Sequence, residues 1–213
     1  KNITLSIDED VLEAGREYAR SHDISFNVLV RKLIEQTVLP QRDAWLTDTF
    51  SLMDRADAHL MADHGHETSY IVSKIFIDTN ILIYTLDKND PFKQEHSREI
   101  FKKTVESHQA VISTQVINEF YVVAVNKLKV DPALAKNIIH NFRNMEIVET
   151  DLALIEEAID IRLISQLSFW DSLIIAAAEK AKCSFVFSED LNSGQNYRGV
   201  MLFNPLEKDF FSL

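Results

Sequence analysis

The chain has 213 residues, of which 46% are hydrophobic and 26% charged, a composition typical of a globular protein with a buried core. Only four glycines, four prolines and one cysteine are present, which excludes collagen-like, linker-rich and disulfide-scaffold proteins and fits a reducing cytoplasm. The net charge of −11 argues against nucleic-acid binding through an overall basic surface, and no apolar run approaches the ~20 residues of a membrane span. We therefore expect a cytoplasmic protein without a membrane partner, whose contacts with nucleic acid are local or bridged by cations.

The first segment, residues 1–40, predicts a strand followed by two helices. Apolar residues alternate with polar ones over residues 2–7, which is the period of a strand with one apolar face. Asp8 and Ser25 are typical N-cap residues, so a helix is expected after each, with Pro40 just beyond the second. Forty residues are too few to bury a core alone, and a lone strand leaves its ladder unpaired. We therefore expect two copies to pair as a dimer.

This first segment resembles the ribbon–helix–helix DNA-binding domains of antitoxins, on its pattern more than on a fixed motif. The resemblance implies operator DNA as a partner. Outward side chains of the strand would enter the major groove, and the start of the second helix would hold a phosphate. The residues expected to make these contacts are Asn2, Thr4, Ser6, Ser25 and Asn27. The alternative interpretation is a dimerisation strand with solvated hydroxyl side chains.

Residues 41–73 predict an amphipathic arm and a polar linker. Apolar side chains recur at helical spacing from Ala44 to about Ala62. Nothing in the first segment is large enough to need them, so we expect this arm to lie on another surface. Residues 63–69 show no periodicity and predict an exposed linker, and their acids and histidines match the spacing of no closed metal site.

The last segment, residues 74–213, alternates predicted strands and helices. Strands are expected at 75–77, 110–113, 146–149, 184–187 and 200–203. Helices are expected at 97–107, 114–128, 131–144, 152–165 and 169–182. This alternation predicts one α/β domain, a parallel sheet with helices on both faces.

Four acids lie where these strands end or where the following helices begin, and open parallel sheets bind ligands outside the carboxyl ends of their strands. They are Asp78, Glu119, Asp171 and Asp190. Converging carboxylates repel each other unless cations lie among them. Mg²⁺ or Mn²⁺ is therefore expected, and two such ions form the usual arrangement for phosphodiester hydrolysis. Simpler roles are a helix-dipole partner for Asp171, a solvated helix residue for Glu119 and a turn residue for Asp190, with which Glu189 competes.

The acids lie in four short stretches of sequence: FIDTNILIY at 76–84, STQVINEF at 113–120, FWDSLIIAAA at 169–178 and SEDLNSGQ at 188–195. With these stretches, residues 73–213 resemble the PIN-domain nucleases and, more narrowly, the VapC toxins of bacterial VapBC toxin–antitoxin systems. The resemblance implies a Mg²⁺- or Mn²⁺-dependent endoribonuclease that cuts tRNA or rRNA, with the four acids as catalytic metal ligands. It also implies that polar side chains support these acids, and that the protein forms a homodimer or a higher even-numbered oligomer. The supporting residues would be Thr79, Asn80 and Ser188.

An antitoxin-like segment thus precedes a toxin-like nuclease in one chain. In the systems that the chain resembles, these are separate proteins, and the C-terminal part of the antitoxin covers the active site. We expect residues 42–62 to be such an inhibitory arm, held by Trp45, Phe50 and Met53, with Arg55 as the candidate to reach the acids. The hypothesis is a self-inhibited ribonuclease that also binds its operator DNA as an autorepressor.

Three alternative interpretations compete with this hypothesis. The first is a DNA-binding transcriptional repressor with a catalytically silent PIN domain that serves assembly. The second is a haloacid-dehalogenase-like phosphatase, which also begins with Asp after an apolar strand but needs a second Asp where Asn80 stands. The third is a receiver-like signalling domain, which the missing early acidic pair disfavours.

Overall fold

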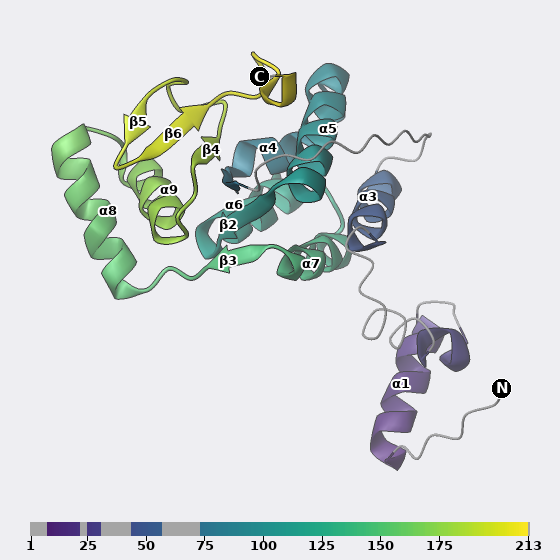
Figure 1. Cartoon of the computed structure of the whole chain (residues 1–213). Coiled ribbons are helices and arrows are strands. Elements are labelled where there is room, and N and C mark those ends of the chain that lie inside the picture. The colour runs from purple at the N-terminus through teal and green to yellow at the C-terminus, as the bar shows by residue number, and fades with distance from the viewer. Residues whose placement is uncertain (1–7, 22–24, 31–43, 57–72, 213) are drawn as a thin grey trace. The chain divides into compact units, whose positions relative to one another are not determined.

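The structure is a computed structural model, and it describes residues 8–21, 25–30, 44–56 and 73–212. The chain divides into two compact units, residues 1–44 and residues 45–213. In the first unit, α1 (Glu9–Ser21) begins directly after the predicted N-cap Asp8 (Figure 1).

The two described helices of the first unit approach each other closely. Residues 26–30 are helical, as predicted for the residues after Ser25. At Gly15 of α1, an added Cβ would lie 2.7 Å from Cε2 of Phe26. A side chain on α1 at this point would therefore force the ring of Phe26 to shift.

The second unit is built on a sheet that has six strands in the described part of the chain, in the order β3-β2-β1-β4-β6-β5. The strands are β1 (Lys74–Ile77), β2 (Gln109–Ser113), β3 (Glu146–Val148), β4 (Phe185–Phe187), β5 (Asn196–Tyr197) and β6 (Val200–Phe203). All neighbours pair in parallel except β5 and β6, which are antiparallel. The predicted parallel α/β sheet is confirmed, and the short strand β5 is an addition to it.

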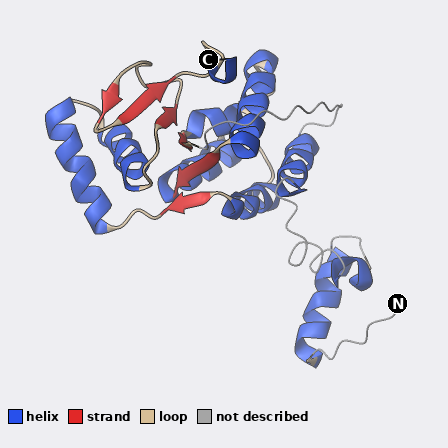
Figure 2. Ribbon diagram, in the orientation of Figure 1, coloured by secondary structure: helices blue, strands red, loops and turns tan. Residues whose placement is uncertain are grey.

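Helices flank the sheet and connect its parallel strands (Figure 2). They are α4 (Thr79–Tyr84), α5 (Pro91–Ser107), α6 (Thr114–Asn126), α7 (Pro132–Asn141), α8 (Leu152–Ser165) and α9 (Phe169–Lys180), with 3₁₀ turns η1 (Phe142–Asn144) and η2 (Phe210–Ser212). No single helix among the described residues is long and apolar enough to cross a membrane; α8 and α9 meet the length and composition criterion only as a pair bent by 117°.

Two helices depart from the sequence-based expectation, both after β1. α4 follows Asp78, whose side chain accepts a hydrogen bond from the backbone N–H of Thr79 and so caps the helix. α5 begins at Pro91 and not at residue 97 as predicted, because Asp90 caps it by accepting from the N–H of Lys93. Proline at the first helical position needs no hydrogen-bond partner for its nitrogen, so the helix extends six residues further toward its N-terminus.

The order of the strands creates a switch point between β1 and β4. The chain runs from β1 to β2 and β3 on one side, and then returns to β4 on the other side of β1. Right-handed crossovers place α4–α7 on one face of the sheet and α8–α9 on the other. At the carboxyl ends of β1 and β4 the connections therefore diverge, which is where open α/β sheets bind ligands.

The helix predicted for the inhibitory arm is present as α3 (Ala44–Ala56), and it belongs to the second unit. Leu46 and Met53 are buried in the core of this unit. Trp45 and Phe50 make edge-to-face contacts with Phe101 of α5, with ring centroids 6.2 and 6.0 Å apart. α3 is therefore packed against α5; residues 57–62 of the expected arm lie outside the described residues.

Candidate active site at the carboxyl ends of β1 and β4

Asp78 is the centre of the candidate site. It follows β1 directly, and only 6% of its surface is exposed. Its Oδ1 accepts a hydrogen bond from the N–H of Thr79 at 2.6 Å, and its Oδ2 accepts one from the hydroxyl of Ser188 at 2.7 Å. Ser188 is the first residue after β4, so the hydroxyl that supports Asp78 comes from the neighbouring strand across the switch point.

Burial raises the pKa of Asp78 from 3.8 to about 6. The hydrogen bonds from Ser188 and Thr79 act in the opposite direction, since they stabilise the charged form. The negative charges of Glu119 and Asp190 raise the pKa further. A carboxylate that is desolvated and surrounded by like charges favours binding of a proton or of a cation.

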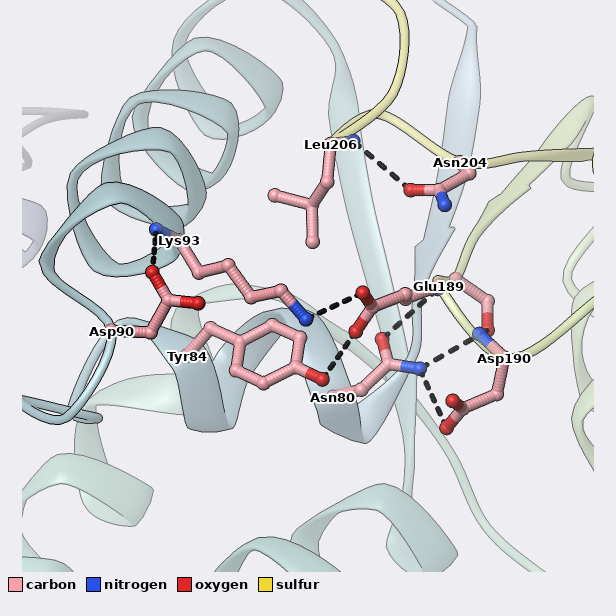
Figure 3. A network of polar contacts seen from close by, with 9 residues as sticks. Asn80, Tyr84, Asp90, Lys93, Glu189, Asp190, Asn204 and Leu206 are labelled. Atoms are coloured by element: carbon pink, nitrogen blue, oxygen red, sulfur yellow. Dashed lines mark hydrogen bonds and ion pairs between the residues drawn. The ribbon is translucent and has the colours of Figure 1, made fainter.

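Asn80 links Asp78 to Asp190, and Figure 3 shows its contact with Asp190. Its Nδ2 lies 3.1 Å from Oδ2 of Asp78 and 3.1 Å from Oδ2 of Asp190, and 3.2 Å from the Ser188 hydroxyl. The N–H of Asp190 donates to the same hydroxyl at 3.2 Å. One amide group therefore holds two carboxylates on either side of the switch point in a common arrangement.

Glu119 reaches the site from α6. Its Oε2 accepts a hydrogen bond from the Thr79 hydroxyl at 2.8 Å, and its Oε1 accepts one from Nε2 of Gln115 at 3.0 Å. Gln115 was missed by the sequence analysis, although its position four residues before Glu119 on a helix places the two on one face. Its Oε1 is buried and has no hydrogen-bond partner in the described part of the chain.

Asp171 is placed next to the site and not in its hydrogen-bond network. It lies in the first turn of α9, and its N–H donates to the hydroxyl of the N-cap Ser168 at 3.1 Å. Gln115 of α6 donates to the carbonyl of Trp170 at 3.4 Å, which joins the start of α9 to the helix that carries Glu119. Thus three of the four predicted acids are connected through Thr79 and Asn80, and Asp171 flanks them.

The donor chemistry of the site fits a hard divalent cation. Within the described ranges, no group of three or more His, Cys, Asp or Glu side chains is arranged to hold a metal ion. The groups that converge on Asp78 are nevertheless carboxylates, and the unpartnered Oε1 of Gln115 is a further oxygen donor. Such oxygens are the ligands that Mg²⁺ and Mn²⁺ prefer.

The residues predicted to contact DNA are only partly described. Asn2, Thr4 and Ser6 lie outside the described residues. Ser25 and Asn27 are exposed, and the Ser25 hydroxyl accepts a hydrogen bond from the N–H of Val28 at 3.3 Å, which makes it the predicted N-cap. DNA binding by this segment stays a prediction.

The three residues predicted to hold the inhibitory arm lie on the packed face of α3. Trp45 and Phe50 contact Phe101, and Met53 is fully buried. The side chain of Arg55 lies outside the described residues, so its proposed reach to the carboxylates stays a prediction.

Polar contacts fix α3 to two helices of the second unit. Asp54 pairs with Arg98 of α5 at 2.6 Å, and Asp48 accepts from Asn141 of α7 at 3.3 Å. These contacts lie on α5 and α7 and involve none of the four predicted acids.

Comparison with known proteins assigns the fold that carries this site. A family model for the PIN domain matches residues 75–195, more than half of the chain. A search of curated proteins found no match.

Solved structures with a similar fold include three from bacterial toxin–antitoxin systems, each with a TM-score of 0.47. The Mycobacterium tuberculosis VapC20 toxin, described as cleaving the sarcin–ricin loop, is 17% identical; the match covers 55% of this chain and 91% of the toxin. A Klebsiella pneumoniae toxin–antitoxin complex is also 17% identical, with coverages of 60% and 95%. VapBC2 of Rickettsia felis, bound to a promoter DNA fragment, is 15% identical, with coverages of 61% and 96%.

Proposed function

The chain belongs to the PIN-domain family, and from this premise we propose that it is a metal-dependent endoribonuclease held inactive by its own antitoxin-like segment. PIN domains are generally nucleases, and they typically use divalent metal ions. The observation that carries the proposal is the buried carboxylate of Asp78 at the switch point, with Glu119 and Asp190 close enough to raise its pKa.

Asp78, Glu119 and Asp190 are the residues that would hold Mg²⁺ or Mn²⁺, with Asp171 as the fourth predicted ligand. The ion would supply an activated water and offset the charge of the scissile phosphate. A cation would stabilise the charged form of Asp78, which burial disfavours and whose pKa is raised to about 6. Glu119 and Asp190 are presented to the same place by their hydrogen bonds to α4.

Three uncharged side chains support these carboxylates. Thr79 donates to Glu119, Ser188 donates to Asp78, and Asn80 bridges Asp78 and Asp190. Neutral donors between like charges reduce their repulsion without competing with a cation for the remaining oxygen lone pairs. They would keep the acids in place before the metal binds.

We propose RNA, either tRNA or rRNA, as the substrate. The chain has a net charge of −11, so bound divalent ions would provide the local positive charge that a phosphodiester backbone requires. Residues 1–40 are proposed to bind operator DNA, and paired copies of this segment favour a homodimer or a higher even-numbered oligomer.

The test measures RNA cleavage by a variant of the chain that has a protease site inserted within residues 63–69. The variant is assayed before and after it is cut at this site. Both forms are compared with and without Met53→Ala, which weakens the packing of α3. A pool of tRNA and rRNA is supplied with Mg²⁺ or Mn²⁺. We expect cleavage that EDTA stops, that Asp78→Asn abolishes, and that the exposed-acid control Asp160→Asn leaves unchanged. If no form cuts any RNA with either ion, the proposal fails, and a repressor with a silent PIN domain becomes the better account.

A further inference from the structure

A second polar cluster lies beside the candidate site, on the side of Asn80 opposite Asp190 (Figure 3). The Glu189 cluster consists of Tyr84 of α4, Lys93 of α5 and Glu189 of the loop after β4. The ammonium of Lys93 lies 2.5 Å from Oε1 of Glu189, and the Tyr84 hydroxyl donates to Oε2. The same ammonium lies over the ring of Tyr84, 4.5 Å from its centroid. Both oxygens of Glu189 are therefore engaged, and its carboxylate is turned away from the acids.

Burial and the hydrogen bonds within this cluster shift the pKa values of Tyr84 and Glu189. Burial raises the pKa of Tyr84, and together with the hydrogen bond to Glu189 it brings the value to about 12. Burial raises the pKa of Glu189 as well, but the hydrogen bonds from Lys93 and Tyr84 outweigh it and leave the pKa below its ordinary value. The side chains of Lys93 and Glu189 are 31% and 26% exposed. A half-buried pair in a network of this kind holds its geometry better than an isolated surface pair.

The cluster is connected to the site through the backbone of Glu189. The N–H of Glu189 lies 3.4 Å from Oδ1 of Asn80, so the oxygen of this amide faces the loop after β4. Its Nδ2 is thereby left to face Asp78, Ser188 and Asp190. Anchoring the side chain of Glu189 thus fixes the peptide that orients Asn80.

We propose that Glu189, held by Lys93 and Tyr84, is a positioning residue that orients Asn80 and Asp190 and thereby sets the affinity of the site for its divalent ion. Glu189 is not a metal ligand, and Lys93 acts on the loop after β4 and not on the RNA backbone. The proposal rests on the proposed metal dependence, but it does not require that RNA be the substrate.

The test measures Mn²⁺ affinity of the full chain by titration calorimetry, for Glu189→Gln, Lys93→Met and the conservative Lys93→Arg. We expect Glu189→Gln and Lys93→Met to weaken Mn²⁺ binding about tenfold, the usual effect of losing a group that orients a ligand. Lys93→Arg should restore most of the affinity. The Lys93→Met/Glu189→Gln double variant should be no weaker than either single variant, because both remove the same contact.

The matched control is a Lys–Glu pair within α5, the helix that also carries Lys93. Lys103 lies 2.7 Å from Glu99 and over the ring of Phe211, 5.4 Å from its centroid. Lys103→Met should leave Mn²⁺ affinity unchanged. In RNA cleavage by the form that is cut within residues 63–69 and carries Met53→Ala, the Glu189 cluster variants should recover kcat at high Mn²⁺ with an unchanged KM for RNA.

Four results would overturn the proposal. Abolished Mn²⁺ binding in Glu189→Gln, as in Asp78→Asn, would make Glu189 a ligand. A raised KM for RNA in Lys93→Met with unaltered Mn²⁺ affinity would make Lys93 an RNA contact. Unaltered Mn²⁺ affinity in every variant, or no binding by the parent chain, would also refute it. If the chain binds Mn²⁺ through Asp78 but cuts no RNA, the ribonuclease fails while the positioning role stands on the binding data.

Discussion

Asp78 is a single buried acid that lowers the stability of the fold when it is charged. Its carboxylate lies at the end of an apolar strand, and burial, together with the charges of Glu119 and Asp190, raises its pKa to about 6. Hydrogen bonds from Thr79, Ser188 and Asn80 offset only part of the desolvation. The metal-free site therefore destabilises the fold at neutral pH, and a bound cation would relieve it.

This placement predicts a pH dependence for the metal-free chain. The pKa of Asp78 is raised from 3.8 to about 6 on folding, so the protonated carboxyl stabilises the fold. That contribution is complete below the unfolded value and is lost as the pH rises through about 6, up to about 3 kcal/mol in all. In urea unfolding with EDTA, Asp78→Asn should remove this loss, which falls between about pH 4 and 7, whereas Asp160→Asn should keep it. Equal pH slopes for Asp78→Asn and the parent chain would contradict the argument.

Ser188 is the second residue whose role can be measured. It is 1% exposed, donates to Asp78, and accepts from the N–H of Asp190. Ser188→Ala should lower the free energy of unfolding by about 1–3 kcal/mol, since buried polar partners are left unpaired, and it should raise the pKa of Asp78 further. The N-cap variant Ser168→Ala should cost about 1 kcal/mol without shifting that titration. If both serine variants give the parent's pH profile, Ser188 does not tune Asp78.

At the scale of elements, α3 is the part of the predicted arm that packs into the core of the second unit. Leu46, Thr49 and Met53 are buried on one side of this helix, and Trp45 and Phe50 enclose the ring of Phe101. A helix anchored by fully buried side chains behaves as part of the core and not as a loosely bound arm. Its ion pair between Asp54 and Arg98 is half-exposed and should add little.

Met53→Ala should therefore lower the free energy of unfolding by about 2–5 kcal/mol, the usual cost of a cavity in a packed core. Ser51→Ala, an exposed position on the same helix, should change it by less than about 0.5 kcal/mol. Chemical denaturation of the intact chain, followed by circular dichroism, measures both. An equal, small effect of the two substitutions would show that α3 does not pack on α5 in solution.

At the scale of the whole molecule, the packing of α3 predicts how inhibition would be released. Cutting within residues 63–69 removes the covalent link between the segments and so lowers the effective concentration of the arm. The buried contacts of α3 remain after the cut, so cleavage alone should change the RNA-cutting rate by less than about twofold. Cutting combined with Met53→Ala should raise the rate about tenfold or more. Full activation by cutting alone would show that the linker, and not α3, holds the inhibition.

Local patterns in the sequence are enough to predict the alternation of strands and helices, the parallel sheet, and the placement of Asp78, Glu119 and Asp190 near its carboxyl edge. These features depend on local periodicity, on capping residues and on the general rule for parallel sheets. The N-caps at Asp8, Ser25 and Ser168 could be predicted for the same reason, because capping depends on residues three positions apart.

Which of the two acids after β4, Glu189 or Asp190, faces the site depends on contacts between distant parts of the chain. Asn80 and Asp190 are 110 residues apart in the chain, as are Asp78 and Ser188, and Lys93 and Glu189 are 96 apart. Lys93 and Tyr84 bind both carboxylate oxygens of Glu189. No local sequence pattern predicts this contact. The contact of Gln115 with Trp170 and the packing of α3 on Phe101 likewise depend on elements that are far apart in the chain.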